Sequence, residues 1–169
     1  MSLTYKIHRS LPDAERVALF EWGTDVFQGA LYQLRWRAAE RHVVGYLDGK
    51  PVTQVGLVKQ EVVAGKEKRW VAGVGGVVTV PSQLRKGFAR ACLLRAHDVM
   101  KDELGVSHGF LFCPERLLGF YSGTGWRRIE DKVMIDQPQG KVTSPLLSMV
   151  ISFGDAWPRG TVDLQSLPW

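Results

Sequence analysis

Residues 77–93, VVTVPSQLRKGFARACL, decide the fold of this chain. The β-branched run at the start predicts a strand, and the apolar spacing after Gly87 predicts an amphipathic helix. Three cations, Arg85, Lys86 and Arg90, stand where this helix begins, although helix starts usually prefer negative charge. Unpaired backbone N–H groups at a helix start bind phosphate oxygens, and a glycine lets a ligand approach closely. The stretch therefore predicts an anion site, with a solvated cationic turn as the alternative.

The strand before this loop is rich in glycine, at Gly73, Gly75 and Gly76. Glycine inside a strand marks a bulge or a close backbone approach. A bulged strand that splays from its neighbour leaves a crevice, in which a thin ligand could lie with a diphosphate on the helix start. The loop is too short for a Walker A motif, and it does not match the GxGxxG fingerprint of dinucleotide-binding folds.

The rest of the chain predicts an alternation of strands and helices. Strands are expected at residues 3–9, 41–47, 51–63, 69–80, 106–113, 127–136 and 144–153, with a hairpin turn at residues 48–50. Helices are expected at residues 10–27, with Ser10 as N-cap and Val17 in the buried stripe, and at residues 87–102 and 114–126. This order is typical of an α+β fold with one central sheet. Residues 1–169 are expected to form a single domain that ends in an ordered tail, 154–169.

The composition narrows the function classes. The 169 residues include 22 Lys and Arg against 17 Asp and Glu, a net charge of +5, which suits an anionic small ligand, a nucleic acid or an acidic partner. The cations are scattered along the chain, which argues against a nucleic-acid surface. The sequence shows no apolar run long enough for a membrane helix and no signal segment at its start, so a membrane protein is not expected. Cys92 and Cys113 lack zinc-site spacing; we expect two buried thiols, no metal and a reducing cytoplasm.

Two motifs together resemble the GNAT superfamily of acetyl-CoA-dependent N-acetyltransferases. Residues 84–89, LRKGFA, are similar to the family's Arg/Gln-x-x-Gly-x-Gly/Ala loop, except that Leu84 stands in the first position. Residues 119–126, GFYSGTGW, resemble its FYxxxG passage followed by an aromatic residue. The resemblance extends over residues 3–153 and implies a three-layer fold with a mixed, mostly antiparallel sheet of about seven strands and a splayed central strand. It also implies acetyl-CoA as co-substrate and direct attack by a primary amine of a small molecule.

The same resemblance implies roles for individual residues. It implies that acetyl-CoA is bound by Val78, Thr79, Val80, Arg85, Lys86, Gly87, Phe88, Ala89 and Arg90. The N–H around Val78 would stabilise the oxyanion, and Tyr121 would protonate the leaving thiolate; the alternative for Tyr121 is a packed ring whose hydroxyl bonds backbone.

The sequence does not identify a base, because residues 71–80 contain no carboxylate. His108 is expected in the core and His97 on the surface. Glu21, Asp25 and Glu40 are expected to be surface carboxylates, with a place in the acceptor site as the alternative. A chain of water molecules that carries the proton to bulk solvent is a further alternative.

The tail has a resemblance of its own. Residues 157–160, WPRG, and 167–169, LPW, are similar to the C-terminal ends of aminoglycoside 2′-N-acetyltransferases. This implies that the carboxylate of Trp169 accepts the amine proton, whereas the alternative is a tryptophan that only packs. The net positive charge argues against a polycationic acceptor. A non-catalytic CoA- or nucleotide-binding module is the competing function, and the oligomeric state, including a homodimer, stays open.

Overall fold

The computed structural model describes residues 2–23, 26 and 32–169. Its strands are β1 (Thr4–His8), β2 (Arg41–Leu47), β3 (Lys50–Ala64), β4 (Glu67–Thr79), β5 (His108–Cys113), β6 (Arg127–Ile129), β7 (Val133–Gln137), β8 (Gly140–Thr143), β9 (Leu147–Ser152) and β10 (Val162–Asp163). Its helices are α1 (Asp13–Phe20), α2 (Phe88–Asp102) and α3 (Leu118–Ser122), with 3-10 turns η2 (Pro81–Gln83) and η3 (Glu115–Leu117).

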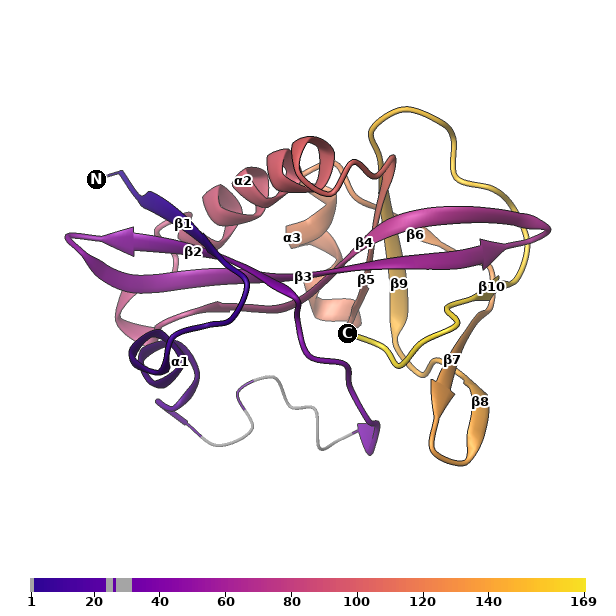
Figure 1. Ribbon diagram of the computed structural model, residues 1–169, viewed down its shortest axis with the longest axis horizontal. Coiled ribbons are helices and arrows are strands. Elements are labelled where there is room, and N and C mark those ends of the chain that lie inside the picture. The colour runs from indigo at the N-terminus through magenta and orange to yellow at the C-terminus, as the bar shows by residue number, and fades with distance from the viewer. Residues whose placement is uncertain (1, 24–25, 27–31) are drawn as a thin grey trace.

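All ten strands join one mixed sheet, in the order β6-β9-β5-β4-β3-β10-β7-β8, with β2 also on β3 and β1 on β2 (Figure 1). The long β3 makes this possible, because its first half pairs with β2 and its end pairs with β10. The α+β class and the mixed sheet are confirmed. The sheet exceeds the expected seven or so strands through short additions such as the hairpin of β7 and β8 and the two-residue β10.

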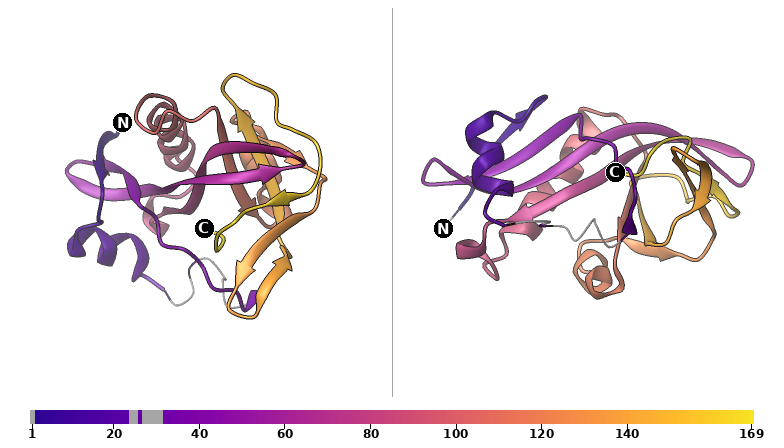
Figure 2. Two further views of the ribbon diagram at one scale, coloured as in Figure 1. Left: turned by 45° about the vertical axis from the view of Figure 1, so that its right-hand side comes forward. Right: turned by 90° about the horizontal axis from the view of Figure 1, so that it is seen from below.

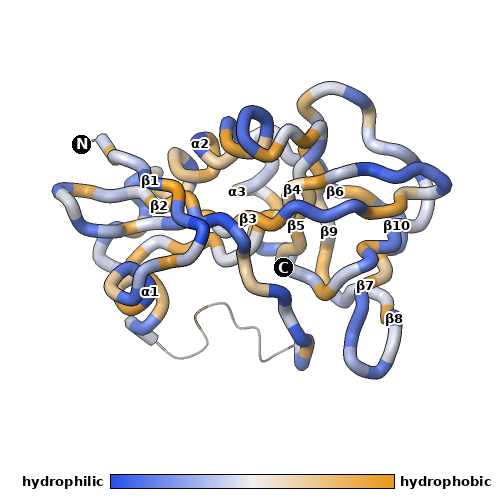
Figure 3. Tube along the Cα trace, in the orientation of Figure 1, coloured by the Kyte–Doolittle hydropathy of each residue, from blue (hydrophilic) through white to orange (hydrophobic). Residues whose placement is uncertain are grey.

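The fold has three layers, with the sheet in the middle. Helix α2 and α3 pack on one face, where apolar residues of α2 meet β2, β3, β4 and β5. The other face is covered by α1 at one end and by the C-terminal tail at the other (Figure 2). The tube in Figure 3 shows the apolar residues gathered in central strands such as β9, whereas the loop between β7 and β8 is hydrophilic. Different elements cover the two faces of the sheet, so a ligand bound between its strands would contact different residues on each face.

Helix α2 follows the predicted pattern. Its buried positions recur at helical spacing, namely Phe88, Cys92, Leu93, Ala96, His97, Val99 and Met100. Both cysteines are buried and reduced, as expected. The prediction for His97 is wrong: it is 7% exposed, and its Nε2 accepts a 3.0 Å hydrogen bond from Nε1 of Trp126. Burial lowers the pKa of His97 to about 4, so the ring is neutral at pH 7.

Helix α1 is shorter than predicted. The backbone of Pro12 is extended, with φ −59° and ψ 152°, so the helix begins after it and Ser10 is not its N-cap. Only Leu19 of its residues is buried, and Val17 is 48% exposed. Residues Glu21 and 22–23 follow the helix as turn, and Phe27, expected at the end of the helix, lies outside the described residues.

The predicted strand at residues 127–136 is two strands, because its halves have different partners. Arg127–Ile129 pairs with β9, whereas Val133–Gln137 pairs with β8 and β10. The chain must cross between these parts of the sheet at residues 130–132. Pairing to distant strands leaves no local signal in the sequence.

Candidate active site at the divergence of β4 and β5

The central feature of the site is the point where β4 and β5 separate. The two strands are parallel and pair from Val71 with His108 to Val74 with Leu111. Within the described residues, β4 continues beyond Val74 with β3 alone, whereas β5 continues with β9 to Cys113. The second half of β4 therefore has an open edge, which we call the β4 edge. Open edges offer unpaired backbone groups to an extended ligand.

A β-bulge at the start of the β4 edge explains the glycines. Gln54 pairs with Val78, but Gly56 pairs with Gly75, so two residues of β4 oppose a single residue of β3. Gly76 has φ +58°, a conformation that favours glycine. The Nε2 of Gln54 donates a 2.6 Å hydrogen bond to the Gly76 carbonyl, and Oε1 of Gln54 is 2.9 Å from Nδ1 of His42. The buried Gln54 thus holds the bulge in place, a role that β-strand patterning alone did not reveal.

The predicted backbone contacts of residues 78–80 are not equivalent. The Val80 N–H donates to the Val52 carbonyl at 2.9 Å, so it is already bonded to β3. Antiparallel pairs alternate between bonded and non-bonded residues, so the backbone groups of Val78 also point to β3 and those of Thr79 point to the β4 edge. Of the three residues, Thr79 is the one whose backbone faces the opening. Val80 is corrected as a backbone donor because its N–H is bonded to Val52, and the N–H of Val78 is corrected as the oxyanion donor because it points to β3.

The start of α2 leaves backbone N–H groups without a capping side chain. Its N-cap is Gly87 with φ +79°, and among the described residues no side chain caps the helix. The first intrahelical bond runs from Ala91 N–H to Gly87 C=O, so the N–H groups of residues 88–90 precede the ladder. Arg85 also has a positive φ of 60°, which brings the loop backbone around this end.

The three cations at this helix start lie on the surface. Arg85, Lys86 and Arg90 are exposed, and none of them forms an ion pair with any described carboxylate. Nζ of Lys86 donates to Oε1 of Gln83 at 2.9 Å. No described carboxylate therefore offsets the repulsion among the three cations, whereas a bound diphosphate would offset it.

Tyr121 lies on the α2 side of the opening. It belongs to α3, is 6% exposed, and packs edge-on to Phe120 and Trp126. Within the described part of the chain its hydroxyl forms no hydrogen bond, yet the oxygen is not fully enclosed. Burial, with a smaller effect of the nearby Cys113, raises the pKa of Tyr121 well above its ordinary value, so the phenol keeps its proton. The alternative role predicted above, a hydroxyl bonded to backbone, is not observed among these residues.

Trp169 lies on the opposite face of the same opening. A Cβ added at Gly73 would overlap its indole, and one added at Gly75 would lie 2.7 Å from its main-chain carbonyl carbon. Its Nε1 donates a 3.1 Å hydrogen bond to the Phe110 carbonyl of β5. The indole therefore spans from β4 to β5, and the main-chain carbonyl of Trp169 lies against Gly75, at the first residue beyond the last β4–β5 pair. The glycines at these two positions make room for the tail.

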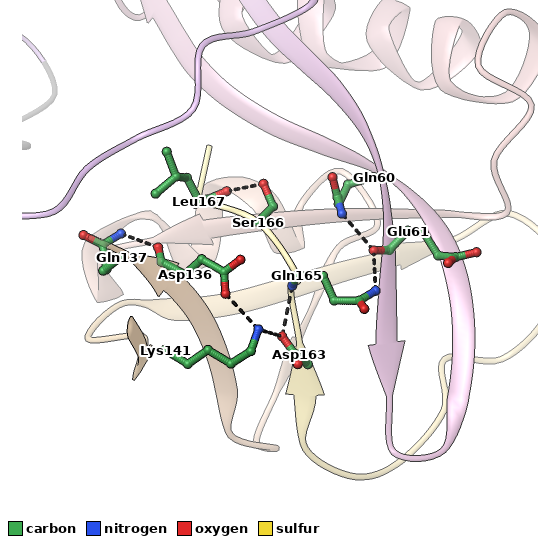
Figure 4. A network of polar contacts seen from close by, with 9 residues as sticks. All are labelled: Gln60, Glu61, Asp136, Gln137, Lys141, Asp163, Gln165, Ser166 and Leu167. Atoms are coloured by element: carbon green, nitrogen blue, oxygen red, sulfur yellow. Dashed lines mark hydrogen bonds and ion pairs between the residues drawn. The ribbon is translucent and has the colours of Figure 1, made fainter. Parts of the chain in front are cut away.

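A polar network holds the tail in this place (Figure 4). Nζ of Lys141 bonds Asp136 at 2.8 Å and Asp163 at 2.9 Å, and Nε2 of Gln165 donates to the Glu61 carbonyl at 3.1 Å. Backbone bonds add to it: Asp136 N–H donates to the Ser166 carbonyl at 3.0 Å. The segment before Trp169 is thus fixed to β3, β7 and β8.

Comparison with known proteins agrees with this geometry. Residues 8–129 match the model of the family described as "Acetyltransferase (GNAT) domain". The chain belongs to the GNAT acetyltransferase family. Its reaction class is therefore acyl transfer, and more specifically acetyl transfer. No curated protein sequence matches it.

Solved structures show the same fold at low identity. A GNAT family acetyltransferase from Brucella melitensis in complex with acetyl-CoA has a TM-score of 0.56 and 16% identity, with 94% of each chain covered. An N-acetyltransferase from Lactobacillus plantarum has a TM-score of 0.60 and 18% identity, covering 91% of this chain and 100% of the other. A GNAT family N-acetyltransferase from Escherichia coli in complex with CoA has a TM-score of 0.60 and 15% identity, covering 97% and 91%.

The other candidate groups of this GNAT domain have structural partners. His108 is fully buried, and its ring nitrogens lie 2.9 Å from Oγ of Ser107 and 2.7 Å from the Asp155 carbonyl, as expected for a core histidine. Glu40 pairs with Arg37 at 2.7 Å, Glu21 pairs with Arg16, and Asp25 lies outside the described residues.

The described residues contain no cluster of three His, Cys, Asp or Glu side chains that could hold a metal. None of the helices in that part of the chain is long and apolar enough to cross a bilayer.

A hollow of about 280 Å³ opens at the end of β5. It is lined by Tyr32, Cys113, Pro114, Glu115, Arg128, Pro145, Leu146 and Leu147. Cys113 is two residues beyond the last β4–β5 pair, so the hollow adjoins the opening. Its volume lies just below the range for ligand pockets, about 300–1,000 Å³.

Proposed function

We propose that this chain transfers the acetyl group of acetyl-CoA to a primary amine of a small molecule, by direct attack with both substrates bound. One observation carries the proposal: the opening between β4 and β5 has an uncapped helix start and Tyr121 on one face, and the carboxyl group of Trp169 on the other. The donor and the acceptor would therefore meet from opposite faces of the sheet. Such positioning converts a bimolecular step into one within a complex.

The residues at the start of α2 fit the diphosphate of acetyl-CoA. The N–H groups of residues 88–90 supply hydrogen bonds, and Arg85, Lys86 and Arg90 supply charge. The exposed Leu84 cannot add the polar contact of the usual Arg or Gln. The backbone of Thr79 at the β4 edge would pair with the pantetheine arm, and N–H groups near the bulge would stabilise the developing oxyanion.

Each proton in the reaction has a candidate partner. The neutral amine attacks the thioester carbonyl carbon, an N–C bond forms and the C–S bond breaks. The carboxyl group of Trp169, against Gly75, would accept the proton that the amine loses, directly or through a water molecule. The Tyr121 hydroxyl would supply a proton to the departing thiolate, since its phenol is protonated at neutral pH. With the Trp169 carboxyl group as the base, the reaction needs no carboxylate from residues 71–80, which contain none.

Thiol release with a panel of amines tests the reaction, and calorimetry with CoA tests the donor site. Changing both Arg85 and Arg90 to alanine should weaken CoA binding by roughly tenfold or more for each arginine, because charge-assisted hydrogen bonds contribute about 1.5–3 kcal/mol each. Lys101→Ala is the matched control, since this cation lies in the last turn of the same helix. Heat with CoA but no thiol release with any amine would identify a non-catalytic CoA-binding module instead. Neither heat nor release at millimolar CoA would refute the proposal.

A second experiment addresses the base. Once intact mass establishes that the protein ends at Trp169, two residues appended to it would move the carboxylate away from Gly75. We expect kcat to fall about 100-fold, in the range for a lost proton acceptor, with CoA affinity unchanged. A kcat within twofold of the parent would exclude the Trp169 carboxyl group as base.

A further inference from the structure

The Trp169 indole has a position that the proposed chemistry does not require. The proposed base is the carboxyl group, whereas the ring lies further along the sheet, over Gly73. Gly73 pairs with Phe110, one residue before the last β4–β5 pair. The ring thus covers the inner end of the opening on the tail face, where β4 and β5 come together.

Aromatic residues enclose the indole on the β5 side. The rings of Phe110 and Phe112 lie 6.2 Å and 6.0 Å from it, centroid to centroid, and its Nε1 is bonded to the Phe110 carbonyl. Trp169 is 6% exposed and belongs to the apolar cluster of this face. The inner end of the opening is therefore filled by a large ring in close contact with both strands.

The ring is also held from behind. Arg37 N–H donates to the Pro168 carbonyl at 2.7 Å, and Nη1 of Arg37 donates to Oγ of Ser166 at 3.2 Å. Together with the network of Figure 4, these bonds fix the residues immediately before Trp169. An acyl group entering the opening would contact the Trp169 indole. It could displace this ring only by breaking several hydrogen bonds of the tail.

We propose that the Trp169 indole limits the length of the acyl group that this protein accepts, restricting the donor to acetyl-CoA and similarly short acyl-CoA thioesters. The inference rests on the proposed function, because it places the thioester at the β4–β5 divergence. A carbonyl group near the bulge directs its alkyl end toward the junction of the two strands, where the ring leaves no space. Removing the ring opens an apolar cavity between Gly73 and Phe110.

The test compares acyl-CoA donors in matched variants. The ratio of kcat/KM for hexanoyl-CoA to that for acetyl-CoA should rise about 250-fold in Trp169→Ala, because four further methylenes gain about fourfold each when buried. Trp169→Phe, which fills part of the space and preserves folding best, should give an intermediate ratio. Using a ratio within one variant removes any effect of a displaced carboxyl group on kcat.

Trp157→Ala is the control for general loosening of the tail. Trp157 is an equally buried tail tryptophan of the same cluster and also packs against Phe110, but its other ring contact is His108 and it does not lie against Gly73. Its ratio should stay within threefold of the parent's. A ratio unchanged in Trp169→Ala, an equal rise in Trp157→Ala, or efficient use of hexanoyl-CoA by the parent would each overturn the inference.

Calorimetry separates this inference from the proposed function. S-ethyl-CoA and S-hexyl-CoA are unreactive probes of the opening. The parent should bind S-ethyl-CoA more tightly, and Trp169→Ala should reverse the preference, whether or not any amine is acetylated. Absence of thiol release would thus refute only the proposed function, whereas equal preference in the parent and Trp169→Ala would refute only the length limit.

Discussion

A methyl group added at Gly73 tests directly whether the Trp169 indole rests on β4. The Cβ of Gly73→Ala would overlap the ring, so the indole must leave its place. The backbone of Gly73 lies outside the left-handed region, so alanine itself causes no strain there. The substitution therefore acts only through the contact with Trp169.

The magnitude follows from what the indole loses. Truncating a buried Trp to Ala costs about 3–5 kcal/mol, and the lower figure applies to a residue at the end of the described chain. Alanine in place of glycine within a strand recovers roughly 0.5–1 kcal/mol. Gly73→Ala should therefore lower the free energy of unfolding by about 2 kcal/mol, and Trp169→Ala by about 3 kcal/mol. In the double variant the clash is gone, so it should be no less stable than Trp169→Ala and slightly more so.

Urea denaturation of the parent, both single variants and the double variant gives the coupling energy. We expect about 3 kcal/mol, because the two substitutions remove the same contact. Thermal melting should follow, with Gly73→Ala melting roughly 4–8 °C below the parent, at about 2–4 °C per kcal/mol for this chain length. Additivity within about 0.5 kcal/mol would show that the indole does not lie on Gly73, and the length limit would lose its basis.

Three further predictions concern the other side of the site and the core. Tyr121→Phe should lower kcat about 100-fold in thiol-release assays with CoA affinity nearly unchanged; equal turnover from pH 6 to 9 would remove its role as proton donor. Gly87→Ala should cost about 1–2 kcal/mol in urea unfolding and weaken CoA binding, because φ is +79° there; an unchanged stability would contradict that backbone conformation. The pKa of His97 is lowered from 6.5 to about 4, so its contribution to stability is complete above pH 6.5 and is lost as the pH falls toward 4, on the order of 3 kcal/mol. The free energy of unfolding of His97→Gln should vary less with pH between 6.5 and 4 than that of the parent. The same dependence on pH in both proteins would show that His97 does not have the lowered pKa.

Much of the fold was predictable because its signals are local. The Asp48-Gly49 turn has both residues at positive φ, 49° and 77°, and joins β2 to β3 as the dipeptide indicates. The apolar spacing of α2 predicted its buried face. The position of His97 was not predictable, because the same spacing fits an exposed polar residue until Trp126 lies beside it.

Within the site, the sequence showed the parts but not their relations. The glycines of β4 indicated a bulge, yet the amide of Gln54 that holds it comes from the neighbouring strand. The family resemblance implied that residues 78–80 bind acetyl-CoA, yet the hydrogen bond from Val80 to Val52 shows that their backbone groups do not all face the opening. Hydrogen-bond direction depends on pairing register, which a single strand does not contain.

The prediction of an anion site at the start of α2 needed nothing beyond residues 84–90, since a left-handed glycine and the first turn of a helix are made by consecutive residues. The face of the opening that we propose for the acceptor was decided by the tertiary structure alone. Gly73 and Trp169 are distant in the chain, and only the sheet order, with β10 between β3 and β7, brings the tail across β4. Contacts of this kind arise from the packing of the whole chain, so no local pattern in either segment could predict them.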